Sequence, residues 1–147
     1  MRYSGSYAVL LALHLVGVLL VVGPLALTTA TASRAVRAGD ASALTTALTA
    51  IRVLSGASLL VVLLGLAMLG RDAPAWELTD GWVLASLALW FVAVGLASGG
   101  VVPALREALT AAPAARPGLT RRVSVAGGLS TLCWVAIVVL MVYKPGA

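Results

Sequence analysis

The sequence is poor in residues that carry polar chemistry. Among its 147 residues there is no asparagine and no glutamine, and there are only one cysteine, one histidine and five acidic residues. A single cysteine excludes an internal disulfide and a multi-cysteine metal site. Charged residues make up 10% of the chain, against about 25% in ordinary soluble domains. These shortages argue against a soluble globular protein.

The few ionisable residues are also badly placed for catalysis. Every Asp and Glu lies outside the long apolar stretches, whereas the one histidine, His14, lies inside the first of them. A Ser-His-Asp set, a phosphate-binding loop ending in Lys-Ser/Thr and a carboxylate-based antiporter are therefore not expected. The basic residues border apolar stretches and form no nucleic-acid-binding module. We favour a protein without enzymatic activity that binds no nucleic acid.

Hydrophobic residues dominate the chain, at 61% of the total. A helix rising about 1.5 Å per residue needs about 20 apolar residues to cross the hydrocarbon core of a membrane. A helix satisfies its own backbone hydrogen bonds, and the chain shows no period-2 alternation typical of a membrane barrel. We therefore predict an all-α fold, a four-transmembrane-helix bundle formed by a single domain over 1–147. The predicted spans are 7–27, 49–69, 81–102 and 123–143.

The first apolar run has an alternative interpretation as a cleaved signal peptide. Arg2 precedes it, and the Ala-Thr-Ala sequence at 30–32 resembles a small-residue cleavage site. However, Arg34 and Arg37 follow directly and would resist translocation, and the run is longer than a usual signal core. We therefore retain four spans.

The distribution of basic residues predicts the orientation, because Lys- and Arg-rich connections stay in the cytoplasm. Connections 28–48 and 103–122 hold more of them than the termini and the middle connection. The two groups are Arg34, Arg37, Arg106, Arg116, Arg121 and Arg122 against Arg2, Arg71 and Lys144. We expect an integral protein of the bacterial cytoplasmic membrane with both basic connections in the cytoplasm and both termini on the extracytoplasmic side. The lipid bilayer is its first partner, with anionic headgroups meeting arginines at the basic edge.

Local signals predict how the first two spans are shaped. Gly23 and Pro24 predict a kink in the first span, because proline removes a backbone hydrogen bond and clashes with the preceding turn. The first helix meets no strong breaker before Gly39. Asp40 is then expected to cap a long second helix that begins near Ala41 and stops at Gly70.

Similar signals bound the last two spans. Thr79 or Asp80 is expected to cap the third span. Residues 103–112 are expected to form a short interfacial segment, because Pro103 suits a first helical turn. The prolines around 114–118 predict a loop, after which Thr120 would cap the fourth helix.

His14 is the strongest candidate for a functional side chain, because an ionisable group at membrane depth is costly and usually faces the bundle interior. Gly17 lies on the same helix face and leaves room for a neighbouring helix or a flat cofactor. Three roles stay open for His14: a hydrogen bond to a Ser, Thr or carbonyl on the next helix, ligation of a haem or metal, and proton handling. A haem held by two ligands of one chain would need Met68 or Met141 as well. Cys133 is expected to pack as a small apolar residue.

Arg52 is a second intramembrane candidate, because it lies inside the predicted second span. Its side chain either reaches cytoplasmic headgroups or holds an ion pair or an anionic ligand inside the bundle. Small residues at four-residue spacing in the last two spans allow close backbone approach, within the bundle or between copies. These helix-packing candidates are Gly95, Gly99, Ser124 and Gly128.

Several short motifs carry a resemblance to known membrane proteins. The sequence LHLVG at 13–17 opens the first span, Arg52 and Gly65 lie in the second, and LMVYKP at 140–145 closes the fourth. Together they resemble a family of small bacterial four-helix integral membrane proteins of unknown function. The histidine in the first span is also distantly similar to that of the copper-resistance protein D group and of HemJ-type protoporphyrinogen oxidase. That likeness implies haem as a cofactor and His14 as its candidate ligand.

Three functions are therefore expected, in order of preference. The first is a non-catalytic accessory or scaffold subunit of a membrane assembly, which self-associates or binds a larger membrane complex. The second is a haem- or quinone-linked membrane redox protein that uses His14. The third is a small-solute or proton carrier, whose path would need the few intramembrane hydroxyl groups. Those groups belong to Ser55, Ser58, Ser86, Ser130 and Thr131.

Overall fold

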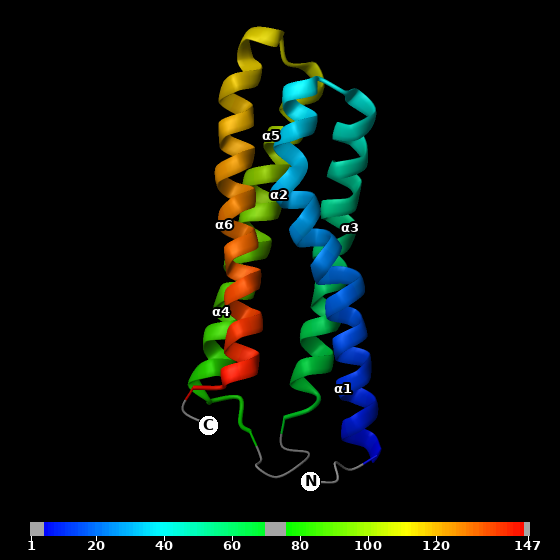
Figure 1. Cartoon of the computed structure of the whole chain (residues 1–147), viewed down its shortest axis with the longest axis vertical. Coiled ribbons are helices and arrows are strands. Elements are labelled where there is room, and N and C mark those ends of the chain that lie inside the picture. Colours follow the sequence, from blue (N-terminus) through cyan, green and yellow to red (C-terminus); the bar gives the residue numbers. More distant parts are fainter. Residues whose placement is uncertain (1–4, 70–75, 146–147) are drawn as a thin grey trace.

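The computed structural model describes residues 5–69 and 76–145, and all regular structure in these residues is helical. The helical segments join into four long runs that go up and down in turn (Figure 1). Along the chain they are α1 (Gly5–Gly17), η1 (Val18–Val22) and α2 (Gly23–Ala38); α3 (Ala41–Leu66); α4 (Gly81–Gly95), η2 (Leu96–Val101) and α5 (Val102–Thr110); and η3 (Pro113–Ala115) with α6 (Arg116–Tyr143).

Each run is long and apolar enough to cross a membrane. Large apolar side chains face outward on all of them; Leu19, for example, is 72% exposed and Phe91 is 68% exposed. Such outward apolar faces suit lipid rather than water. The predicted all-α bundle of four membrane-spanning helices is confirmed, and the length and composition of the helices indicate an integral membrane protein.

The bundle has two different ends, which are named here for later use. The termini end holds the start of α1 and the end of α6, together with the end of α3 and the start of α4 (Figure 1). The turn end holds the two short connections, from α2 to α3 and from α5 to α6. The start of α1 and the end of α6 thus lie at one end, as an even number of crossings requires.

The connection between α2 and α3 forms as predicted. Gly39 has a φ of 65°, the left-handed conformation that ends many helices, and Asp40 occupies the N-cap of α3. The carboxylate of Asp40 accepts hydrogen bonds from the backbone N–H of Ser42 at 2.9 Å and of Ala43 at 3.1 Å. The helix α3 ends at Leu66, earlier than predicted; Gly70 lies outside the described residues.

Of the three boundaries predicted in the second half of the chain, the start of α4 lies where expected and the other two are wrong. Asp80 is the N-cap residue of α4, but its carboxylate accepts from the N–H of Glu77 at 2.9 Å rather than from the helix. The 103–112 region is no separate segment, because α5 continues η2 and buries side chains such as Leu105. The expected 114–118 loop is helical and Thr120 lies within α6, because proline is tolerated in a first helical turn.

The proline kink takes the form of a wide π-helical turn. Gly23 N–H donates to Val18 O just before Pro24, and Val102 N–H donates to Ala97 O just before Pro103. A π turn is one of the identifiable causes of bending in a long helix. The first run starts beside α3 and crosses toward α6 in its upper part (Figure 1), so α1 packs mainly on α3 whereas α2 packs on both α3 and α6.

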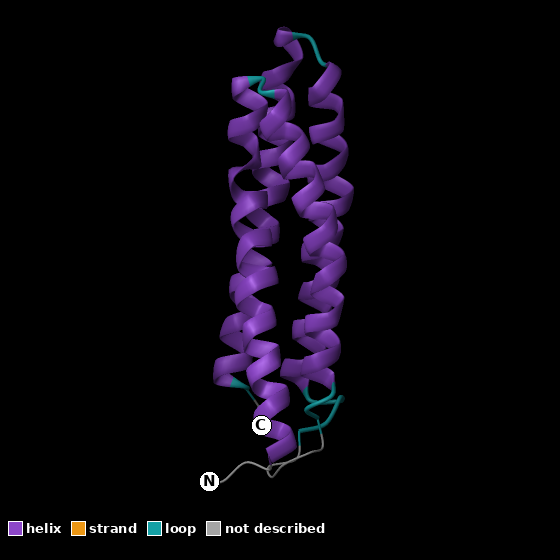
Figure 2. Cartoon of the chain, turned by 90° about the vertical axis from the view of Figure 1, so that its right-hand side faces the viewer, coloured by secondary structure: helices purple, strands orange, loops and turns teal. Residues whose placement is uncertain are grey.

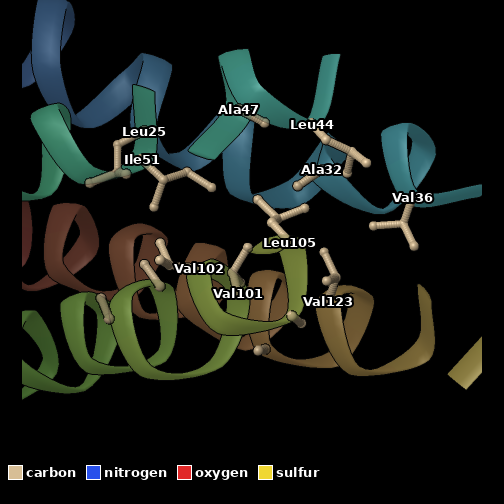
Figure 3. Packing of buried hydrophobic residues seen from close by; sticks show 14 of the residues in the cluster. Leu25, Ala32, Val36, Leu44, Ala47, Ile51, Val101, Val102, Leu105 and Val123 are labelled. Carbon is tan, nitrogen blue, oxygen red and sulfur yellow. The ribbon is translucent and has the colours of Figure 1, made fainter. Parts of the chain in front are cut away.

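The well-packed core lies toward the turn end. Side chains from α2, α3, α5 and α6 interlock there, and Leu25, Ile51, Leu105 and Val123 are essentially fully buried (Figure 3). The side view in Figure 2 shows only helices and short connections in the described part of the chain. Toward the termini end these helices stand as two pairs, α1 with α3 and α4 with α6 (Figure 1). The space between these two pairs is where the candidate site lies.

Candidate functional site

His14 faces α3 and is 7% exposed. Its Nδ1 lies 2.9 Å from the backbone carbonyl oxygen of Val61. A carbonyl only accepts hydrogen bonds, so Nδ1 carries the proton and Nε2 of the neutral ring is an acceptor. Of the three roles expected for His14, the hydrogen bond to a carbonyl on a neighbouring helix is thus present.

Two glycines make room for this contact. A Cβ at Gly65 would lie 3.0 Å from His14 Cε1, and a Cβ at Gly17 would lie 3.0 Å from Val61 Cγ2. Small residues let two membrane helices approach closely. The structure therefore brings together three residues of the family-like motifs, His14, Gly17 and Gly65, whereas Arg52 lies elsewhere.

A cavity of about 300 Å³ lies beside His14 toward the termini end. All four helical runs contribute to its lining, which is mostly apolar and rich in tryptophan. Cavities of about 300–1,000 Å³ with a few placed polar groups are typical ligand sites. The polar or polar-tipped lining residues are Tyr7, His14, Ser58, Ser86, Trp76, Trp82, Trp90, Trp134 and Lys144.

Two of the tryptophans that line this cavity have an indole N–H without a hydrogen-bond partner. Trp82 is 8% exposed and Trp134 is 5% exposed, and Nε1 of each is buried. Trp90, by contrast, donates from Nε1 to Ser58 Oγ at 3.0 Å. An unpaired buried donor costs about 1–3 kcal/mol, and two residues that line one cavity each carry such a donor.

A cation lies near the termini end of this cavity. Lys144 Nζ lies 3.3 Å from the ring centroid of Trp76 and 5.7 Å from that of Trp82. The two rings themselves meet edge to face, with centroids 6.1 Å apart. Burial among them lowers the pKa of Lys144 below its ordinary value of 10.5, because desolvation disfavours the ammonium.

The serine and threonine hydroxyls expected for a solute path bond mainly to the backbone. Ser58 donates to Ser55 O, Ser86 to Trp82 O and Ser130 to Ala93 O, at 2.7–2.9 Å. Thr131 donates to Gly127 O at 2.8 Å. Ser130 thereby links α6 to α4, which is the polar bridging common between membrane helices.

The predicted helix-packing stripe does not lie inside the bundle. A Cβ at Gly95, Gly99 or Gly128 would meet nothing within 4 Å, and Ser124 is exposed. The close approach occurs instead at Gly127, where an added Cβ would overlap the backbone carbonyl of Thr29. The prediction that these four residues pack within the bundle is thus wrong. Their regular spacing places them on one face of a helix but does not show which helix faces are in contact.

The metal interpretation finds no support in the geometry. No group of three or more His, Cys, Asp or Glu side chains gathers anywhere in 5–69 or 76–145. Cys133 is half-buried and packs against the core, as expected for a small apolar residue. Met68 and Met141 do line the same cavity as His14, so the donor types of a His/Met-ligated haem occur around one space.

Sequence reasoning missed the tryptophans as site residues. Trp76 and Trp82 fit an interfacial belt, and Trp134 lies in the middle of an apolar run that offers no local signal. One signal was available, because a buried tryptophan needs a hydrogen-bond partner for its N–H. That signal marks each tryptophan as a candidate site residue, but it does not show which tryptophans line the same cavity.

The fold and the cavity together define the class of protein. It is a four-helix membrane bundle with a ligand-sized, tryptophan-lined cavity between two pairs of helices. Comparison with protein-family models, with curated proteins and with solved structures found no match.

Proposed function

We propose that this chain is a non-catalytic accessory membrane protein that binds a lipophilic, carbonyl-bearing ring compound of the quinone class in the cavity beside His14. The observation that carries the proposal is the pair of buried, unpartnered indole N–H groups on Trp82 and Trp134. A quinone ring presents carbonyl oxygens that accept from such donors. Its apolar ring and tail suit the rest of the lining.

The chemistry of His14 supports the same class of ligand. With Nδ1 donating to Val61 O, Nε2 is left as an acceptor. A reduced quinol carries hydroxyl groups that donate, whereas the oxidised quinone carries carbonyls that accept. One cavity with indole donors and an imidazole acceptor therefore offers partners to both forms.

The orientation of the bundle gives the cavity its place in the membrane. Basic connections favour the cytoplasm, so we propose that the turn end faces the cytoplasm and the termini end faces outward in a bacterial cytoplasmic membrane. The cavity then lies in the outer half of the bilayer. Its ligand would enter from the lipid, where a quinone is dissolved.

Calorimetric titration with decylubiquinone tests this function on the purified protein in mild detergent. Saturable binding is expected, about tenfold weaker or more in His14→Phe and in Trp134→Phe, because each removes a polar partner and keeps an aromatic ring. Leu13→Ala is the matched control, since Leu13 is next to His14 but 50% exposed on the outer surface.

A second probe separates recognition from simple partition. Decylbenzene carries the same tail and a ring without oxygen, so it should not bind saturably. Equal affinity for decylbenzene and decylubiquinone, or unchanged affinity in both aromatic variants, would contradict the proposed function.

Haem is a second candidate ligand, favoured by one observation. Met68 and Met141 line the same cavity as His14, and Lys144 at its termini end offers a cation to an acidic side chain of the macrocycle. When bound there, haem would supply electron transfer. The visible spectrum of protein from haem-replete cells decides this: a Soret band lost in His14→Ala supports haem, and a colourless preparation rejects it.

An accessory role also needs a surface for association. Gly95, Gly99 and Gly128 leave open space on outward faces of α4, η2 and α6, respectively, where a further helix can approach closely. We propose this face as the contact for a second copy or for a membrane partner. Cysteine crosslinking from position 99 in native membranes tests it, and a chain that crosslinks to nothing while running as a monomer contradicts it.

A further inference from the structure

A second recess lies on the side of the bundle, between α3 and the run formed by α4, η2 and α5. It has a volume of about 520 Å³ and is lined by residues of both. It is more open than the cavity beside His14, and its lining is more polar. The lining residues are Arg52, Ser55, Gly56, Leu59, Trp90, Val94, Ser98, Val102, Pro103 and Arg106. We call this recess the lateral groove.

Two arginines border the lateral groove from opposite helices. Arg52 of α3 and Arg106 of α5 are both exposed. Across 5–69 and 76–145, neither lies within ion-pair distance of a carboxylate; Glu107, next to Arg106, is paired with Arg122 at 3.9 Å instead. The groove therefore carries two positive charges that the described residues leave uncompensated.

A buried hydroxyl group adds a third donor to the lateral groove. Ser55 is 7% exposed, and its Oγ is buried without a hydrogen-bond partner. It follows Arg52 by three residues, so the two side chains lie on the same face of α3. An unpaired buried hydroxyl is unfavourable, and on a residue that lines the same groove as two arginines it is suited to an anionic oxygen.

Apart from Ser98, the remaining lining is mostly apolar, and part of it lies toward the middle of the bundle. Leu59 and Gly56 on α3 face Val94 and Trp90 on α4. Gly56 has nothing within 4 Å of an added Cβ, so it leaves the groove wide. A hydrocarbon chain fits this part and a phosphate fits the arginine-bordered part.

The depth of the arginines agrees with a lipid lying in this groove. At about 1.5 Å per residue, Arg52 lies about 21 Å from the end of α3 at Leu66, and Arg106 lies about 37 Å from the start of α4 at Gly81. A hydrocarbon core is about 30 Å thick. Arg52 thus lies about 9 Å inside the boundary and Arg106 about 7 Å outside it, so a phosphate at the boundary would lie between the two long side chains.

We propose that the lateral groove is a binding site for an anionic phospholipid, with its phosphate between Arg52, Arg106 and Ser55 and an acyl chain along Gly56, Leu59 and Val94. The lipid is a site-bound ligand, distinct from the surrounding bilayer and from the ligand of the cavity beside His14. This site does not depend on the quinone proposal.

Native mass spectrometry tests the site on the full chain released from nanodiscs of phosphatidylglycerol and phosphatidylcholine in equal amounts. Wild-type protein should retain one phosphatidylglycerol in preference to phosphatidylcholine. The double variant Arg52→Gln/Arg106→Gln should lose this preference by about tenfold or more, because charge-assisted hydrogen bonds are strong. The charge-matched control is Arg37→Gln/Arg121→Gln, which removes two exposed arginines at the same end and should keep the preference.

A further variant distinguishes the contribution of the shape of the groove from that of its two arginines. Gly56→Leu fills the groove and keeps both arginines, so the retained lipid should be lost. Gly118→Leu is its control, because a Cβ there also meets nothing within 4 Å but lies outside the groove. Since Arg52, Arg106 and Gly56 are all exposed, these variants should fold, and circular dichroism with gel filtration verifies this.

Two kinds of result overturn the proposal. The first concerns retention of phosphatidylglycerol. The proposal is wrong if retention is unchanged in both the double arginine variant and Gly56→Leu, or if the charge-matched control loses the lipid to the same extent as the double arginine variant. The other is displacement of the lipid by millimolar inorganic phosphate, which would make the groove a site for a free anion instead.

Discussion

The imidazole of His14 on α1 lies against the backbone of Gly65 on α3, so that a Cβ at Gly65 would be 3.0 Å from Cε1 and 3.3 Å from Nδ1 of the ring. The same ring hydrogen-bonds Val61 O one turn earlier on α3. Glycine at position 65 therefore sets the distance between α1 and α3, and with it the position of the imidazole beside the cavity.

The first prediction compares two glycines of α3. Replacing glycine by alanine within a helix favours folding by about 1 kcal/mol. Gly56→Ala should show this gain, because open space surrounds a Cβ there, whereas Gly65→Ala should lose part or all of it to His14. Free energies of unfolding in detergent measure the difference, and equal gains would show that the His14 contact is unimportant.

The second prediction compares two adjacent glycines of α6. A Cβ at Gly127 would overlap the backbone carbonyl of Thr29 on α2, which cannot move aside as a side chain can. Overpacking of this kind costs about 1–3 kcal/mol, so Gly127→Ala should lower the melting temperature clearly. Gly128→Ala, with open space around its Cβ, should not. Similar melting temperatures for the two variants would refute the close contact between α2 and α6.

The third prediction concerns the bond from Trp90 Nε1 to Ser58 Oγ, which joins α4 to α3 at 3.0 Å. A double-mutant cycle of Trp90→Phe and Ser58→Ala should give a coupling of about 0.6 kcal/mol and at most about 1.7 kcal/mol, the range measured for bonds between membrane helices. Trp134→Phe with Ser58→Ala should give none, because Trp134 Nε1 has no partner. A cycle without coupling for Trp90 would contradict the geometry.

The fourth prediction concerns the pH dependence that Lys144 contributes. Its pKa in the folded protein lies below the ordinary value of 10.5, so the folded state binds fewer protons than the unfolded state between these two values. The contribution of Lys144 to stability therefore increases as the pH rises through this window.

Deprotonation also removes the cation from the ring of Trp76, so tryptophan fluorescence should change with a midpoint below 10.5. Lys144→Met should abolish this step and leave the titration of tyrosines. A midpoint at or above 10.5 would mean that contact with the ring outweighs desolvation.

Some features of the site were predictable because they depend on one helix at a time. His14 and Gly17 share a face by helical spacing, and Asp40 after Gly39 marks a cap by its chemistry alone. The start of α6 was not predictable from the sequence, because the prolines at 113 and 117 fit both a loop and a first helical turn.

Other features depend on the relative placement of two helices and could not be predicted from the sequence. Trp82 and Trp134 line one cavity although they lie on α4 and α6, and Arg52 and Arg106 line one groove although they lie on α3 and α5. Each residue alone is ambiguous, because a tryptophan suits an interface and an arginine suits a headgroup. Only their position around one shared space indicates a ligand.

The amino-acid sequence by itself determined that the chain forms four apolar helices, because apolar length and backbone hydrogen bonding are local properties that add along the chain. The tertiary structure decided which faces meet, where the cavity and the groove lie, and which donors are left unpaired. Lipid is as apolar as leucine, so hydrophobicity does not choose between helix faces in a membrane. Close contacts at residues such as Gly65 and Gly127 make that choice, and they exist only once the helices are assembled.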